Sequence, residues 1–325
     1  MNRLYDARGN RYRVVSPEVA RDAGVAVPAT AAEAAAAPAW TGAAVDAFCR
    51  ATDPADRAKP FISDGLLVGP FETGAPFSLL IVNTDGGLAE RSGNGLTIFT
   101  TALKDEGLAP TGPFDLRVHH GAGATTTPVE LSIADGVDGV WVSMGEPGYG
   151  PEAVDARADA SRPTTFNRIA CSHVPALAAL DARWSASQFV RVGNPHCVTL
   201  LNDAQALPSW EDLHDEALLA ALTAIADPAG DGRPGGLVCP AGVNLQWAAK
   251  IGPNRLAARV FERGEGPTRS SGTSAVAVAA AALRLKLVEG PRIEVVMPGG
   301  TAPVIAVVPD GGLNMMLFGV ADLLS

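Results

Sequence analysis

The sequence predicts an α+β protein made of two pseudo-symmetric halves, each a barrel-like mixed or antiparallel sheet around a central helix. A serine-glycine turn lies in each half of the 325-residue chain, at Ser92-Gly93-Asn94-Gly95 and at Ser271-Gly272-Thr273-Ser274. A strand-like segment precedes each turn and a helix-forming segment follows it: residues 78–82 and 96–103 for the first turn, 256–261 and 275–286 for the second. One such strand–turn–helix segment in each half indicates an internal duplication.

In the first half, short apolar runs between Gly, Asp and Pro predict strands, and alanine-rich stretches predict helices. The predicted strands are residues 11–15, 65–69, 77–82, 114–119, 129–133 and 139–143. The predicted helices, besides the one after the first serine turn, are residues 31–37 and 43–50. We expect this half to span residues 1–137 and to be completed by the last strand of the chain, at about 312–325.

The second half repeats this order over residues 138–311. Strands at 188–192 and 197–201 flank a predicted turn at 193–196, and an amphipathic helix follows at 213–225. The remaining predicted strands of this half are residues 243–247, 256–261, 292–297 and 301–308, and a last predicted strand at 313–319 closes the chain. Clefts between such halves are common ligand sites, so we expect the substrate to bind there.

Composition excludes several classes of partner. The chain is 47% apolar and 18% charged, which is typical of a globular protein, and its formal charge of -10 argues against nucleic acid or an anionic membrane surface. The longest apolar run, residues 275–283, is too short to span a bilayer, and no apolar segment of a signal peptide follows residues 1–6. The four cysteines are scattered and form no CxxC pair, which favours a cytoplasmic protein. They are Cys49, Cys171, Cys197 and Cys239.

Motifs for cofactors and metals are missing from the sequence. It contains no Walker sequence, no HExxH and no nucleophile elbow. We therefore expect no metal and no organic cofactor, and a small amino-acid-like molecule as the partner.

A series of motifs runs through nearly the whole chain in one order. They are Gly9-Asn10, Asn83-Thr84-Asp85-Gly86, Ser92-Gly93-Asn94-Gly95, Met144-Gly145-Glu146-Pro147, Gly193-Asn194-Pro195-His196-Cys197-Val198, Asn244, Glu262-Arg263-Gly264-Glu265-Gly266-Pro267-Thr268, Ser271-Gly272-Thr273 and Pro298-Gly299-Gly300. In this order they resemble the diaminopimelate epimerase family, which has two similar α/β halves with the substrate between them. The resemblance implies a cofactor-independent isomerase that converts LL- to meso-diaminopimelate, a precursor of lysine and peptidoglycan.

The resemblance also implies roles for individual residues. The non-reacting amino-acid end of the substrate would be held by Asn10, Asn83, Asn194, Asn244, Glu262 and Arg263. The reacting carboxylate would lie on backbone N–H groups at the two helix N-termini, those of Gly93, Asn94, Gly272 and Thr273. Arg263 ends a predicted strand, where an arginine has little packing purpose and a guanidinium suits a carboxylate. His196 and Cys197 are expected to be structural.

The chain departs from the family in its chemistry, because the family's two catalytic cysteines are replaced by Ser92 and Ser271. A thiol titrates near pH 8.5, whereas an alcohol resembles water at about 15.7. This difference of roughly 7 pKa units corresponds to about 10 kcal/mol. A helix dipole stabilises the anion by only about 0.3–2 kcal/mol, so it offsets a small part of that cost. Thr97, Ser270 and Ser274 also differ from the family's usual residues, which indicates a natural variant suited to other work.

Three functions therefore stay open. The serines transfer protons with help from a neighbouring base, for which Glu90 and Glu265 are the nearest acids in the sequence. Alternatively, they only cap helices and contact the ligand, as in a catalytically silent ligand-binding paralogue. In a third reading, Asp64 acts as the single base of an isomerase for another amino-acid-like substrate. The sequence leaves the formation of a homodimer open.

Overall fold

The computed structural model describes residues 1–50, 61–121, 123–230, 235–307 and 313–325. The chain forms two compact units: unit 1 is Met1–Ser143 with Phe318–Ser325, and unit 2 is Met144–Leu317. The sequence placed the divisions after residues 137 and 311. The units instead change inside two strands, β8 (Val137–Gly145) and β19 (Asn314–Gly319). β8 runs across the first predicted division, and residues 314–317 of β19 belong to unit 2 because they pair with residues 304–307 of that unit.

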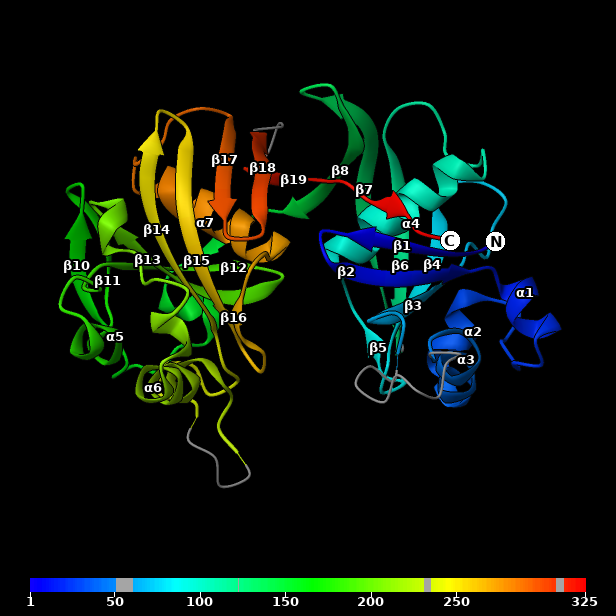
Figure 1. Cartoon of the computed structure of the whole chain (residues 1–325), viewed down its shortest axis with the longest axis horizontal. Helices are drawn as coiled ribbons and strands as arrows, with labels where there is room; N and C mark the ends of the chain where they lie inside the picture. Colours follow the sequence, from blue (N-terminus) through cyan, green and yellow to red (C-terminus); the bar gives the residue numbers. More distant parts are fainter. Residues whose placement is uncertain (51–60, 122, 231–234, 308–312) are drawn as a thin grey trace. The chain divides into compact units, whose positions relative to one another are not determined.

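Unit 1 is a mixed sheet with strand order β20-β1-β2-β3-β4-β6-β7-β8 (Figure 1). The pairs β2–β3 and β4–β6 are parallel and the others are antiparallel. The bounds are β1 Asn2–Ala7, β2 Asn10–Val15, β3 Gly65–Val68, β4 Phe77–Asn83, β5 Leu88–Ala89, β6 Phe114–His120, β7 Gly123–Ala134 and β20 Asp322–Leu323. Its helices are α1 Pro17–Asp22, α2 Ala31–Ala36, α3 Thr41–Phe48 and α4 Gly93–Asp105.

Unit 2 repeats the same arrangement of parallel and antiparallel strand pairs, in the order β12-β13-β14-β15-β17-β18-β19. Here β13–β14 and β15–β17 are parallel and the other neighbours are antiparallel. The bounds are β9 Gly148–Tyr149, β10 Arg162–Phe166, β11 Ile169–His173, β12 Ser187–Val192, β13 Asn194–Leu201, β14 Asn244–Gly252, β15 Arg255–Glu262, β16 Gly266–Thr268, β17 Arg292–Met297 and β18 Gly300–Val307. Its helices are α5 Pro175–Leu180, α6 Glu216–Ala226 and α7 Gly272–Arg284. The predicted α+β class, with two similar halves, is confirmed.

Strand β3, in the centre of the unit 1 sheet, is apolar throughout because helices cover both of its faces. Leu66 and Val68 of β3 belong to the core that includes Trp40 and residues of α2 and α3. Leu67, between them, lies on the opposite face, next to Gly95 of α4. Because successive side chains of a strand alternate between faces, two apolar cores require the unbroken apolar run that the sequence shows here.

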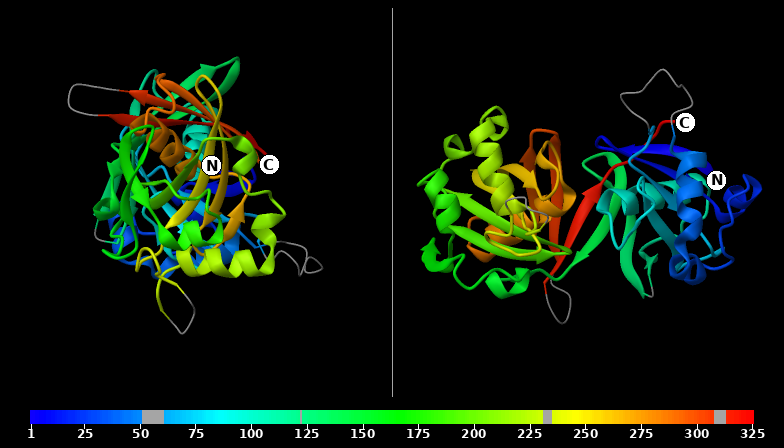
Figure 2. Two further views of the ribbon diagram at one scale, coloured as in Figure 1. Left: turned by 90° about the vertical axis from the view of Figure 1, so that its left-hand side faces the viewer. Right: turned by 90° about the horizontal axis from the view of Figure 1, so that it is seen from below.

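Helix α7 is buried on every side, and this explains its alanines. Every residue from 274 to 282 is buried, and the helix contacts β12, β13, β14, β15, β17 and β18. Figures 1 and 2 show α7, in orange, next to the strands of unit 2. Small side chains on the helix let these strands approach it closely. Neighbouring residues of β14 again alternate: Leu245 and Trp247 pack in the core that includes α6, whereas Gln246 bonds to Ser274 of α7.

Two local predictions need correction. The turn predicted at residues 193–196 is confined to Gly193, at φ 66°, because a left-handed residue reverses the chain and lets β13 begin at Asn194. The helix predicted at 213–225 is divided, since Asp215 caps α6 from Glu216 onward and a short 3-10 turn, Asp212–His214, precedes it.

Among the described residues, no helix combines the length and the apolar character that crossing a membrane requires.

Candidate active site

Strand register gathers the predicted binding residues of unit 2 at one end of its sheet. His196 of β13 pairs with Asn244 of β14, and Leu245 pairs with Phe261 of β15. Asn194, Asn244 and Glu262 therefore lie at the same ends of three neighbouring strands. Asn194 is exposed, whereas Asn244 is buried.

Ser271 and Glu262 form a direct pair at the N-terminus of α7. Ser271 Oγ donates a hydrogen bond of 2.7 Å to Glu262 Oε1, and the Ser271 side chain also caps the helix by accepting from Ser274 N at 3.4 Å. Ser271 is buried. Burial raises the pKa of Glu262, and the hydroxyl hydrogen bond opposes that rise. The site therefore holds a carboxylate with increased basicity against a serine hydroxyl.

Arg263 is held by backbone contacts beside this pair. Its N–H donates to Asn244 Oδ1 at 2.9 Å, and its guanidinium Nη1 donates to the Ala241 carbonyl at 2.6 Å. Gly272 and Thr273 form the first turn of α7, where backbone N–H groups are available to an anion.

Unit 1 places its predicted residues in the same way, at the ends of β2, β3 and β4. Gly65 pairs with Tyr12 on one side and with Asn83 on the other. Asp64, just before β3, accepts from Arg11 N at 2.7 Å and from Asn10 Nδ2 at 3.3 Å. Asp64 and Asn83 are exposed and Asn10 is half-buried.

Ser92 caps α4 as Ser271 caps α7, but it has a different neighbour. Its Oγ accepts from Gly95 N at 3.0 Å and lies 3.5 Å from the hydroxyl of Tyr12. Gly93 and Asn94 form the first helical turn. Tyr12 is buried, and burial raises the pKa of its phenol.

The two serine turns thus share a backbone plan and differ in chemistry. Asn83 ends β4 in unit 1 as Glu262 ends β15 in unit 2, and Tyr12 occupies the place in β2 that His196 occupies in β13. Ser271 faces a carboxylate, whereas Ser92 faces a phenol.

His196 belongs to a buried chain of polar groups behind α7. Its Nδ1 is 3.0 Å from Gln246 Nε2, which also donates to Ser274 Oγ at 3.0 Å. Burial lowers the pKa of His196 to about 3, so the ring is neutral at ordinary pH.

Comparison with known proteins decides the family. Residues 188–322 match the family model described as diaminopimelate epimerase. Diaminopimelate epimerase 2 of Nostoc sp. is 33% identical over 239 residues, covering 73% of this chain and 72% of the relative. The diaminopimelate epimerase of Burkholderia thailandensis is 31% identical over 268 residues, covering 79% and 78%. The chain belongs to the diaminopimelate epimerase family.

Solved structures with the same fold are more distant from this member of the diaminopimelate epimerase family. A phenazine biosynthesis protein of the PhzF family from Bacillus anthracis matches with a TM-score of 0.54 at 12% identity, covering 100% of this chain and 96% of the other. A probable proline racemase from Agrobacterium radiobacter matches with a TM-score of 0.54 at 15% identity, covering 100% and 91%. These likenesses support the fold, and the relatives' names place the chain among isomerases.

Two partners of the serines were not predicted from the sequence. Glu90 and Glu265, the acids nearest to the serines along the chain, are exposed, and Glu90 lies 3.9 Å from His120. The acid next to Ser271 is instead Glu262, which was expected to bind the substrate, and the neighbour of Ser92 is Tyr12. The signal that could have found both is strand pairing, because Glu262 ends β15 and Tyr12 of β2 pairs with Gly65, the first residue of β3.

The first testable prediction concerns capping at Ser92. Ser92→Ala is expected to lower the free energy of unfolding by about 1 kcal/mol, whereas Ser92→Gly lowers it by only a few tenths. Alanine removes the acceptor for Gly95 N, and glycine leaves that N–H open to water. Urea unfolding of the two variants measures this, and equal losses would show that capping is not the structural role of Ser92.

The described residues contain no group of three or more His, Cys, Asp or Glu side chains arranged to hold a metal ion. The four cysteines are free, and three of them are buried.

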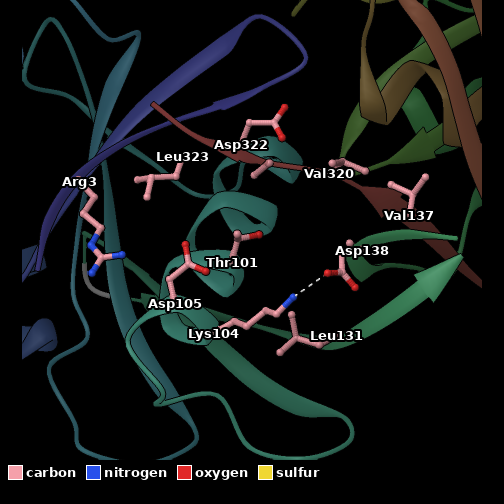
Figure 3. Close-up of a pocket in the computed structure, with 12 residues that line it drawn as sticks. Arg3, Thr101, Lys104, Asp105, Leu131, Val137, Asp138, Val320, Asp322 and Leu323 are labelled. Atoms are coloured by element: carbon pink, nitrogen blue, oxygen red, sulfur yellow. Dashed lines mark hydrogen bonds and ion pairs between the residues drawn. The ribbon is translucent and has the colours of Figure 1, made fainter. Parts of the chain in front are cut away.

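A cavity of about 630 Å³ in unit 1 lies away from Ser92. It adjoins Thr101, Lys104 and Asp105 at the C-terminal end of α4, and Lys104 forms an ion pair of 3.3 Å with Asp138 across it (Figure 3). Ser92 is at the other end of this 13-residue helix, roughly 20 Å along its axis. The cavity is therefore separate from the serine site.

Proposed function

We propose that this chain is a cofactor-independent isomerase that removes and returns the α-proton of an amino acid, with diaminopimelate or a close relative as substrate. The observation that carries the proposal is the 2.7 Å hydrogen bond from Ser271 Oγ to Glu262. Family membership supports the reaction class, and this pair supplies the base that a lone serine lacks.

The pair removes the energetic objection to serine. When Ser271 Oγ takes the α-proton, its own hydrogen passes along the existing hydrogen bond to Glu262, so no free alkoxide forms. The base strength is then that of a half-buried carboxylate with a raised pKa, and enzymes use glutamate for proton abstraction next to a carbonyl group. The roughly 10 kcal/mol penalty for ionising an unaided alcohol does not arise.

Substrate recognition in this proposal follows the family resemblance. The reacting carboxylate lies on the N–H groups of Gly272 and Thr273, where the α7 dipole favours negative charge. Arg263 binds the carboxylate at the other end of the substrate, and the four asparagines bind its polar atoms. They are Asn10, Asn83, Asn194 and Asn244.

One other candidate function has an observation in its favour. Both serines make helix-capping hydrogen bonds, so a ligand-binding protein without turnover would also keep them. The single-base reading through Asp64 has less support, because Asp64 is exposed and bonded to Arg11 N and Asn10.

Proton NMR in deuterium oxide tests the proposal. We expect the α-proton signal of LL-diaminopimelate, or of another amino acid with a second polar end, to disappear with time, and expect Ser271→Ala to abolish that loss. Saturable line broadening without exchange, removed by Arg263→Ala, would replace the isomerase with the binding protein. Exchange that survives both serine substitutions but not Asp64→Asn would favour the single-base isomerase.

A further inference from the structure

Tyr12 lies next to Ser92 in a position that the sequence did not single out. We propose that Tyr12 is a positioning residue of the unit 1 half-site: Ser92 delivers its own hydroxyl hydrogen to the substrate carbanion, and the Tyr12 phenol replaces that hydrogen. This inference rests on the proposed isomerase function and adds the proton source for its second step.

The Tyr12 ring is held in place by the strand beside it. A Cβ atom at Gly65 would lie 2.7 Å from Tyr12 Cε1 and 2.8 Å from the Val82 carbonyl, so only glycine leaves room for the ring. Tyr12 is 7% exposed, and its hydroxyl is 3.5 Å from Ser92 Oγ. This is longer than an ordinary O–H···O bond of 2.5–3.0 Å, as is common for catalytic hydrogen bonds before substrate binds.

The hydrogen bonds of Ser92 are compatible with this direction of proton transfer. Ser92 Oγ accepts from Gly95 N, and its second lone pair is open to the Tyr12 hydroxyl at 3.5 Å, a contact in which either oxygen can be the donor. The proposal takes Tyr12 as the donor, which leaves the Ser92 hydrogen for the substrate. At Ser271 the direction is reversed, because that hydroxyl donates to the carboxylate of Glu262.

The groups around Tyr12 favour its hydroxyl as the proton donor to Ser92. Asn83, which corresponds to Glu262 in the repeat, does not titrate and cannot act as the base for Ser92. Burial of the ring raises the pKa of the phenol, the hydrogen bond with Ser92 opposes that rise, and the negative charge of Asp64 adds to it. Tyr12 is therefore protonated at neutral pH, and a phenol gives up its proton more readily than an alcohol.

The step balances as follows. The carbanion lone pair forms a bond to the Ser92 hydrogen and the Ser92 Oγ–H bond breaks. The proton of the Tyr12 hydroxyl then moves to Oγ, so the Tyr12 O–H bond breaks and a new Oγ–H bond forms. The negative charge moves to the Tyr12 phenolate, which takes a proton from water after the product leaves. Glu262 meanwhile holds the proton that was removed and returns it to water.

Tyr12→Phe tests this inference, because it removes one oxygen and keeps the ring over Gly65. Tyr5→Phe is the matched control: Tyr5 is also a buried tyrosine of unit 1, but its hydroxyl donates to Asp105 at 2.9 Å, near the far end of α4. Two rates are measured for each stereoisomer of the substrate. The exchange rate is the rate of deuterium entry at the α-carbon with retained configuration, and the inversion rate is the rate at which the other stereoisomer forms.

We expect Tyr12→Phe to slow inversion by about 100-fold or more, the usual size of a general acid contribution. For the stereoisomer whose hydrogen Ser271 removes, exchange with retention should continue, so the ratio of exchange to inversion rises. Tyr5→Phe should leave both rates unchanged. If Tyr12→Phe lowers both rates in parallel, or inverts the substrate as fast as Tyr5→Phe does, the role of Tyr12 is wrong and the proposed function is unaffected. No exchange by the unsubstituted protein would overturn this role together with the proposed function.

Discussion

Replacing Glu262 with glutamine is expected to reduce α-proton exchange by about 10²–10⁴-fold, the range for loss of a general base. Glutamine has nearly the same shape and its amide oxygen still accepts from Ser271 Oγ, so the capped N-terminus of α7 should be retained. It cannot accept a proton at neutral pH, however, and Ser271 would then face the full energetic penalty of an alcohol. The measurement is the initial rate of deuterium entry into the substrate, with binding followed separately by ligand line broadening.

Glu265→Gln provides the control for this prediction. Glu265 lies three residues further along the chain, is exposed, and loses the same charge on substitution. The exchange rate of Glu265→Gln should stay close to that of the unsubstituted protein, because the charge of Glu265 is only the smallest of the causes that shift the pKa of Glu262. If Glu262→Gln weakens binding and leaves the exchange rate at saturation unchanged, Glu262 binds the ligand ammonium, as the family resemblance implies, and is not the base. Combining Glu262→Gln with Ser271→Ala should add little to either change, because residues that act as a unit are strongly non-additive.

The second large effect is acid destabilisation of unit 2 through His196. The pKa of a histidine in the unfolded chain is near 6.5, and burial lowers that of His196 to about 3 in the folded protein. Between these values the unfolded state binds more protons, so stability is complete above about pH 6.5 and falls as the pH decreases toward 3. At pH 5 the loss is about 2 kcal/mol, from 1.36 kcal/mol per pH unit over about 1.5 units.

Urea unfolding at pH 7.5 and pH 5 measures this loss. His196→Gln is expected to be less stable at both pH values, but its loss between them should be smaller by about 2 kcal/mol. His214→Gln is the matched control, since His214 is exposed and should leave the pH dependence intact. A pH dependence that is unchanged in His196→Gln would mean that His196 is not the group that titrates.

The sequence predicted elements best where strong local patterns were present. The apolar strands β3 and β4 and the two capped helices α4 and α7 follow from unbroken apolar runs and from serine-glycine turns. β1, β10 and β11 were not predicted, because each is short and carries polar residues that give no clear alternation. Their positions depend on pairing: β1 pairs with β2 along its whole length, and β10 pairs with β11.

By itself the sequence determined the family, the two serine caps and the set of residues expected at the site, since these depend on residue identity and order along the chain. Only the tertiary structure decided which groups the serines contact. Ser271 meets Glu262, nine residues away in the chain, and Ser92 meets Tyr12, 80 residues away. Such contacts depend on strand register and on where each helix begins relative to the sheet, and neither is encoded by spacing along the sequence. The physical reason is that a one-residue shift in the register of β2 or β15 would turn Tyr12 or Glu262 to the opposite face of its sheet, away from the serine.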